Sequence, residues 1–461
     1  MSFISKNPYT SKVLKEVDAW SKDQTKAAID QLHEEYLANK KLGSDKCQYK
    51  IKKSIEKLAN AMENHKKALS EMLSIEMGKP IKESQAEVQK TIDHCRYYAE
   101  KMRELLEPKI VKNEDGVKKG YLYDPLGVAY KITPFNFPIW IALKMVIPSV
   151  LTVNTVLIRP PGCTPQTFDI IQKIFEEAEF KSAMVGFINK DDTDFVMSQN
   201  EIIGVSFTGS TAAGFEISEL AGKNLKRCVL ELGGNDPFIV LKDTDINLAA
   251  ELAAKSRLKN AGQVCFASKR FIVEESVMTE FIDQLKKQLD KVKLGDPLSE
   301  DTTMGPIAKD EYTKKYVKQL KEAVEAGDEV IYGNKEPEGN LVGPSIFKVK
   351  DLEKSVLTVD EVFGPVFAII PFTLIDHAIE LANKTQYGLG ATIVSKDTKN
   401  AELLARQIDA ALIYINDIVT SDSMLPFGGV KQSGFGRDLG THGIESFSNV
   451  KTFSVKSQAS S

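Results

Sequence analysis

The first hundred residues carry apolar side chains at a spacing typical of amphipathic helices. Between residues 24 and 106 the chain is rich in Lys and Glu, and apolar residues recur three or four positions apart, as at Ile55, Leu58 and Met62. That period places apolar side chains on one face of a helix and charged ones on the other. The pattern therefore predicts a layer of helices with solvated outer faces.

From residue 128 onward, short apolar segments alternate with segments of helix length. This order is typical of a parallel sheet covered by helices. The first series of expected strands comprises residues 128–132, 155–159, 184–188 and 203–207. The second series comprises residues 237–241, 270–273, 366–372, 391–394 and 411–415. The alternation predicts an α/β fold with two parallel-sheet domains.

A hairpin is expected between the helical region and the α/β region that begins at residue 128. Residues 109–123 consist of two strand-like segments separated by Glu114, Asp115 and Gly116, which favour a turn. Because this hairpin would project from a helical region, it is a candidate for contact with another subunit.

Composition and charge narrow the class of protein. A chain of 461 residues is expected to form two or three domains, and a net charge of −4 gives no electrostatic case for nucleic acid or an anionic membrane. The most apolar stretch, residues 139–158, is interrupted by Lys144, Pro148 and Asn154, so it is not a membrane span. The five Cys are widely spaced, and no His, Asp or Glu cluster has metal-ligand spacing, so we expect no metal. With no signal peptide recognisable, we expect a cytoplasmic protein.

Two residues in distinctive settings supply candidate chemistry at a carbonyl carbon. Cys265 follows Gly262, Gln263 and Val264, and a glycine there lets the backbone bend and present a thiol at an opening. Glu231 ends an apolar strand beside paired glycines, where burial would raise its pKa toward the range of a general base. A thiolate can attack an aldehyde, and a carboxylate can activate the water that releases an acid. The alternatives are a buried structural Cys and a surface Glu.

Three further segments suit an oxyanion and a nucleotide. Asn136 lies between prolines and aromatic residues, where its amide could be a rigid oxyanion donor or could satisfy local backbone groups. Residues 207–214 join a strand to a helix through Gly and hydroxyl residues, which favours a phosphate. Glu361, before Phe363 and a Gly-Pro turn, could bind a ribose diol or lie on a surface turn.

Together these elements resemble the NAD(P)-dependent aldehyde dehydrogenase superfamily. Further similar segments are residues 154–158, 243–248, 387–390 and 425–437, so the resemblance spans nearly the whole chain. It implies two Rossmann-like parallel-sheet domains: a cofactor-binding domain of residues 1–107 and 131–230, and a catalytic domain of residues 231–430. It also implies a small β oligomerisation element of residues 108–130 and 440–461, and a homodimer or homotetramer.

The resemblance also assigns roles. It implies that Cys265 is the nucleophile, Glu231 the base for thioester hydrolysis, and Asn136 a donor to the oxyanion, with a small aldehyde as substrate. The residues implied to bind the cofactor are Thr133, Pro134, Phe135, Arg159, Thr208, Gly209, Ser210, Leu232, Glu361 and Phe363. A base at Glu231 disfavours the acylating branch of the superfamily, which uses coenzyme A.

Two departures from the superfamily pattern bear on specificity. Where many relatives have Lys-Pro-x-Glu, this chain has Arg159 followed by Pro, Pro and Gly162, so the carboxylate that repels a 2′-phosphate is missing and NADP is slightly favoured over NAD. Lys144 stands where one group of succinate semialdehyde dehydrogenases has an Arg expected to meet the distal carboxylate of the substrate, and Ser421 matches a Ser that assists. Alternatively, Lys144 is a solvated helix Lys and Ser421 a turn residue.

We therefore expect a succinate semialdehyde dehydrogenase. Two alternatives stay open at this point. One is a broad-specificity enzyme for small aliphatic or aromatic aldehydes, and the other is a catalytically silent binding protein, which the presence of Cys265, Glu231 and Asn136 disfavours.

Overall fold

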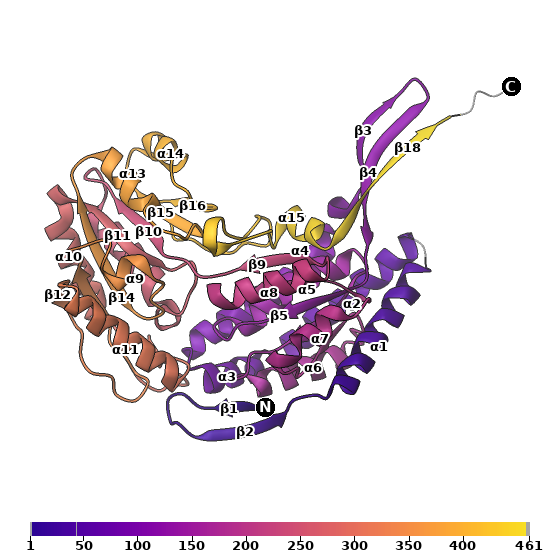
Figure 1. Ribbon diagram of the computed structural model, residues 1–461, viewed down its shortest axis with the longest axis horizontal. Coiled ribbons are helices and arrows are strands. Elements are labelled where there is room, and N and C mark those ends of the chain that lie inside the picture. The colour runs from indigo at the N-terminus through magenta and orange to yellow at the C-terminus, as the bar shows by residue number, and fades with distance from the viewer. Residues whose placement is uncertain (1, 43, 458–461) are drawn as a thin grey trace.

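The computed structural model describes residues 2–42 and 44–457 (Figure 1). These residues form two sheets covered by helices, a projecting three-stranded sheet and an N-terminal hairpin. The hairpin pairs β1 (Ser2–Lys6) with β2 (Val13–Asp18) in antiparallel fashion. The two helix-covered sheets confirm the expected α/β class.

The first sheet has six strands in the order β17-β9-β8-β5-β6-β7. Its strands are β5 (Val128–Ile132), β6 (Thr155–Arg159), β7 (Ala183–Val185), β8 (Ile202–Thr208), β9 (Arg227–Glu231) and β17 (Gly434–Phe435). All neighbouring pairs are parallel except β17 with β9. Neighbouring residues of β5 point to opposite faces: Ala129 packs with α2 to α6, whereas Tyr130 packs with α1, α7 and α8.

The helices around this sheet are mostly long and amphipathic. They are α1 (Lys22–Lys40), α2 (Ser44–Asn64), α3 (Lys66–Met77), α4 (Ile81–Leu106), α5 (Pro138–Leu151), α6 (Pro165–Glu177), α7 (Thr193–Ser198), α8 (Thr211–Lys223) and α15 (Gly440–Ser446), with the 3₁₀ turn η1 (Lys190–Asp192). The expected spacing is confirmed in α2, where Ile55, Leu58 and Met62 are fully buried. Helix α5 is buried along its whole length, so it runs through the body and brings its side chains to the site.

The second sheet has seven strands in the order β12-β13-β14-β11-β10-β15-β16. Its strands are β10 (Asp236–Val240), β11 (Ser268–Glu274), β12 (Glu329–Tyr332), β13 (Ser345–Lys348), β14 (Val366–Phe372), β15 (Gly390–Val394) and β16 (Leu412–Ile415). Its helices are α9 (Ile246–Leu258), α10 (Glu275–Leu289), α11 (Asp310–Glu325), α12 (Val356–Val359), α13 (Ile375–Asn383) and α14 (Thr398–Ala405), with the 3₁₀ turns η2 (Lys259–Gly262) and η3 (Lys431–Ser433). Only β12 is antiparallel to its neighbour among these described strands.

The expected hairpin forms and gains a third strand. Strand β3 (Lys109–Glu114) pairs with β4 (Val117–Pro125), and the turn between them contains Asp115 and Gly116. Strand β18 (Ser448–Lys456) pairs with the other edge of β4. This sheet projects from the body of the molecule (Figure 1). Of the C-terminal residues assigned to this element, 458–461 lie outside the described residues.

Two expected boundaries need correction, and two short strands were not expected. The strand expected at 184–188 is β7, Ala183–Val185, because the chain turns at once: the amide of Ile188 donates to the carbonyl of Gly186. The boundary expected at residue 130 falls inside β5, which belongs to the six-stranded sheet. The short antiparallel strands β12 and β17 were not expected, because segments of two to four residues carry too little periodicity.

Candidate active site

Two cavities meet at the carboxyl ends of β5, β8 and β9, the edge where parallel sheets bind ligands. One is a cleft of about 400 Å³ on the side of α8 and α11, called here the cofactor cleft. The other, of about 200 Å³, lies among α4, α5 and the loop around Ser421, and is called here the substrate cavity. Among the described residues, three line both cavities: Asn136, Glu231 and Cys265. The tertiary structure therefore brings together the three residues that the sequence singled out for chemistry.

The thiol of Cys265 is presented by a sharply bent segment. Asn260, Ala261 and Gly262 all have positive φ angles, of 53°, 53° and 76°. A β-carbon at Gly262 would lie 2.3 Å from the carbonyl oxygen of Gly364, so only glycine fits there. The bend expected from the sequence is confirmed, and it leaves Cys265 half-buried between the two cavities.

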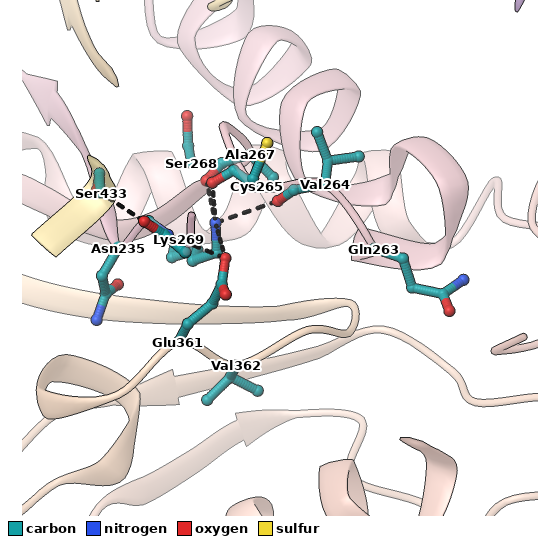
Figure 2. A network of polar contacts seen from close by, with 12 residues as sticks. Asn235, Gln263, Val264, Cys265, Ala267, Ser268, Lys269, Glu361, Val362 and Ser433 are labelled. Atoms are coloured by element: carbon teal, nitrogen blue, oxygen red, sulfur yellow. Dashed lines mark hydrogen bonds and ion pairs between the residues drawn. The ribbon is translucent and has the colours of Figure 1, made fainter. Parts of the chain in front are cut away.

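A buried lysine holds this segment from behind. Figure 2 shows Lys269 between Glu361 and the carbonyl groups of the Cys265 segment. Its Nζ donates to the carbonyl of Cys265 at 2.6 Å and to those of Val264 and Ala267 at 3.2 Å each, and lies 3.5 Å from Oε1 of Glu361. This role could not be predicted from the sequence, because a separation of four residues does not reveal which carbonyl groups converge on an ammonium.

The surroundings of the Cys265 thiol favour its protonated form. Burial, together with the negative charges of Glu231 and Glu361, raises its pKa to about 12. A nucleophilic thiolate therefore requires either a base or a compensating positive charge beside the sulfur.

Glu231 ends β9 as a buried carboxylate. Burial raises its pKa to about 7, although the positive charge of Lys144 opposes the rise. Its Oε2 accepts a hydrogen bond from Nζ of Lys144, which also lies 3.2 Å from Asp438, and its Oε1 has no hydrogen-bond partner among the described residues. A carboxylate with a near-neutral pKa and one free oxygen is suited to accept a proton from a water molecule.

Asn136 is buried and fixed on both sides. Its Nδ2 donates to the backbone carbonyl of Gln263 at 3.0 Å. The backbone carbonyl of Asn136 accepts a hydrogen bond from Nδ2 of Asn260, also at 3.0 Å. The first bond is the local backbone contact considered from the sequence, yet an amide nitrogen carries two protons. The bond to Gln263 fixes the amide, and its second proton remains a candidate donor to an oxyanion.

Most of the expected cofactor-binding residues line the cofactor cleft. They are Thr133, Pro134, Phe135, Thr208, Gly209, Ser210, Leu232, Glu361 and Phe363. Arg159 is not part of this lining, because its Nε donates instead to the carbonyl of Ile188 at 2.9 Å. Lys309, Tyr312 and Lys315, at the start of α11, line the cleft without having been expected; no motif marks them.

The cleft has the features that a dinucleotide needs. Ser210 is the N-cap of α8, so the first amide groups of a thirteen-residue helix begin at the cleft wall and suit a phosphate. Glu361 accepts the N–H of Gly234 at 3.1 Å, and a β-carbon at Gly233 would come 2.7 Å from its carboxylate. No atom lies within 4 Å of the position of a β-carbon on Gly162, so space is open where the superfamily pattern has a carboxylate.

The structure buries Lys144 at the wall of the substrate cavity. Its side chain is 2% exposed, which contradicts a solvated helix Lys. Although it lines the substrate cavity, its ammonium is already paired with Glu231 and Asp438. These charges outweigh burial and raise its pKa. Ser421 does line the cavity, together with two unexpected lysines, Lys90 and Lys259.

The fold and the cleft are those of an oxidoreductase that uses a nicotinamide dinucleotide. The chain belongs to the aldehyde dehydrogenase family, whose model matches residues 2–453, and it is an NAD(P)-dependent enzyme that oxidises aldehydes. It is 35% identical to succinate semialdehyde dehydrogenase [NAD(P)+] Sad of Escherichia coli K12 over 401 residues, 86% of each chain. It is 33% identical to succinate-semialdehyde dehydrogenase [NADP(+)] of Deinococcus radiodurans, over 97% of this chain and 94% of that one.

Solved structures agree with this assignment. The crystal structure of succinic semialdehyde dehydrogenase from Streptococcus pyogenes in complex with NADP+ superposes with a TM-score of 0.94 at 32% identity, covering 98% of this chain and 99% of that chain. In the part of this chain that the structure describes, no helix combines the length and apolar composition needed to cross a membrane.

Proposed function

We propose that this enzyme oxidises succinate semialdehyde to succinate, using NADP in preference to NAD. The observation that carries the chemistry is that Asn136, Glu231 and Cys265 line both cavities, so an aldehyde and a nicotinamide would meet at one thiol. The size of the substrate cavity, about 200 Å³, suits a short aldehyde, and the names of the relatives support the four-carbon semialdehyde.

In the proposed cycle, the Cys265 thiol releases its proton to solvent, and the resulting thiolate attacks the aldehyde carbon and forms a thiohemiacetal. Its oxyanion is stabilised by the side-chain amide of Asn136 and by the backbone N–H of Cys265. A bound nicotinamide would supply the hydride acceptor, and loss of the hydride from the thiohemiacetal carbon leaves a thioester on Cys265. Glu231 then takes a proton from water, the hydroxide attacks the thioester, and the acid leaves as the thiol is restored.

The surroundings of Glu231 support this division of labour. A pKa of about 7 lets the carboxylate be ionised in a useful fraction of molecules near neutral pH. The Lys144 ammonium keeps one carboxylate oxygen in place, and the other is free for water. Lys269 fixes the loop of the nucleophile and the carboxylate proposed to hold the ribose, so both parts of the reaction centre share one support.

The preference for NADP rests on the cleft near Gly162. No side chain fills the space beside Gly162, and Lys309 lines the same cleft. A 2′-phosphate would thus meet a cation rather than a carboxylate. Arg159, which the resemblance places among the cofactor-binding residues, is less suited because it does not line this cleft.

We also propose that the enzyme is a cytoplasmic homodimer or homotetramer. The projecting sheet supports the assembly, since β3 and β18 are edge strands with exposed apolar residues such as Val111 and Val455. Such edges are commonly covered in an oligomer.

The test is formation of reduced cofactor with succinate semialdehyde, comparing NADP with NAD at equal concentration. We expect a clear rate that is faster with NADP. The comparison aldehydes are butanal, which has the same chain length without the carboxylate, and benzaldehyde. Equal rates with butanal or benzaldehyde would instead indicate a broad-specificity enzyme, for which the aromatic lining by Phe137, Trp140 and Phe427 is the supporting feature.

A further inference from the structure

The substrate cavity carries positive charge. Three lysines line the cavity: Lys90 of α4, Lys144 of α5 and Lys259 at the start of η2. Lys144 is paired with two carboxylates beside Cys265. In the described part of the chain, neither Lys90 nor Lys259 forms an ion pair with a carboxylate. The free positive charge of the cavity therefore lies at the end formed by α4 and η2.

Lys90 is held in a defined position at this end. Its Nζ donates to the carbonyl of Ser421 at 2.5 Å and to the Ser421 hydroxyl at 2.8 Å, and lies 4.2 Å from the centre of the Trp140 ring. An ammonium has three protons, so one remains for another acceptor. The Ser421 oxygen already accepts from Lys90, so its own proton is also free to be donated. The two groups are adjacent donors that match the two oxygens of a carboxylate.

The acidic residues of the same cavity are otherwise engaged. Glu87 accepts the N–H groups of Ile139 at 3.0 Å and Trp140 at 3.1 Å and pairs with the buried Lys79. Glu83 accepts the N–H of Asn260 at 2.9 Å. These carboxylates stabilise backbone amides and a buried cation, so Lys90 is left without a partner carboxylate.

We propose that Lys90, together with the Ser421 hydroxyl, binds the distal carboxylate of the substrate and makes the enzyme selective for anionic aldehydes. Lys259, which lies 5.5 Å from the centre of the Phe137 ring, adds positive charge at the same end. Lys144 instead serves the reaction end of the cavity. This assignment rests on the proposed function and gives it a recognition site.

The electrostatics of Lys90 agree with this geometry. Burial and the positive charges of Lys259 and Lys144 lower its pKa to about 7, against the opposing effect of Asp422 and Glu87. An ammonium in such surroundings gains stability from a carboxylate bound beside it.

The test is a comparison of succinate semialdehyde with butanal in the full-length enzyme and its Lys90→Met variant. We expect kcat/KM for succinate semialdehyde to fall about 10- to 100-fold, mostly through KM, because one charged hydrogen bond is lost. Activity on butanal should change little. Lys90→Arg keeps the charge and should retain most of the preference for the anionic aldehyde. The matched control is Lys101→Met, which removes an exposed lysine from the same helix.

Each outcome decides between separate possibilities. If wild-type enzyme prefers succinate semialdehyde and Lys90→Met keeps that preference, the role of Lys90 is refuted while the proposed function stands. Equal losses on both aldehydes, or loss of cofactor binding by fluorescence titration, would assign Lys90 a purely structural role and also refute it. A wild-type enzyme without any preference for the anion would refute the proposed function itself.

Discussion

The ammonium of Lys144 is paired with the carboxylate of Glu231, and both side chains are almost completely buried. Asp438 joins the pair from the C-terminal region, 3.2 Å from Lys144. The charges of Lys144 and Lys131 outweigh burial and lower the pKa of Asp438. Burial of a single charge would be costly, so these groups depend on one another. The proposed general base, Glu231, is therefore held by a network whose lysine lies 87 positions earlier in the chain.

Replacing Cys265 with Ala should abolish aldehyde oxidation. The thiol is the proposed nucleophile, and the variant removes one sulfur atom from a half-buried position. NADP binding, measured by fluorescence titration, should remain within a few-fold of wild type because the rest of the cleft is intact. Turnover comparable to wild type would refute the covalent mechanism.

Replacing Glu231 with Gln should separate the two halves of the reaction. We expect a rapid burst of about one reduced cofactor per active site, followed by turnover slowed about 10²- to 10⁴-fold, since hydrolysis loses its base. Stopped-flow absorbance of the reduced nicotinamide measures both phases. The Cys265→Ala variant, which should show no burst, is the control. A slow first turnover without a burst would contradict the assigned role.

Turnover should rise with pH through about 7 when thioester hydrolysis limits the rate. The pKa of Glu231 is raised to about 7, so the carboxylate is mostly protonated below that value and ionised above it. Only the ionised form accepts a proton, so kcat should be low at pH 6 and reach a plateau above pH 8. The measurement is kcat against pH with butanal, whose binding involves no charge. A flat profile, with a burst demonstrated at each pH, would argue against Glu231 as the base.

The KM for succinate semialdehyde should rise as the pH increases through about 7. Lys90 faces Glu87 on its own helix, Lys144 on α5, Lys259 on η2 and Asp422 in the loop after Ser421, and its pKa is lowered to about 7. Its protonated form, present below that pH, attracts a carboxylate, whereas the neutral amine above it does not.

The KM for butanal should show no such change, and Lys90→Arg should flatten the profile because a guanidinium stays charged. A KM that rises equally for both aldehydes would show that another group is titrating.

Replacing Lys144 with Met should affect catalysis and stability rather than substrate selection. Removing one partner of a buried pair costs about 3–5 kcal/mol. Loss of the positive charge should also raise the pKa of Glu231 and move the rise of kcat to higher pH. Thermal unfolding and the kcat profile measure the two effects. Preference for succinate semialdehyde over butanal should persist; its loss would restore Lys144 as the carboxylate-binding residue.

The amino-acid sequence alone determined the elements and their local chemistry. The strands β5, β6 and β14 lie where the apolar pattern placed them, since strand formation and burial follow from a run of neighbouring residues. The backbone bend at Gly262 was also predictable, because a positive φ angle depends on the type of a single residue. Cys265 and Glu231 could be singled out because their immediate neighbours define their settings.

Only the tertiary structure decided which charges are free. Lys144 contacts Glu231, 87 positions away, and Lys90 contacts Ser421, 331 positions away. Neither pairing can be predicted from the local spacing of apolar residues. The spacing of apolar residues tells which face of α4 or α5 is buried, but not which carboxylate or hydroxyl the other elements bring to that face. Whether a buried lysine supports a base or recognises a substrate depends on that partner, because an ammonium already neutralised in the interior has little attraction left for a ligand.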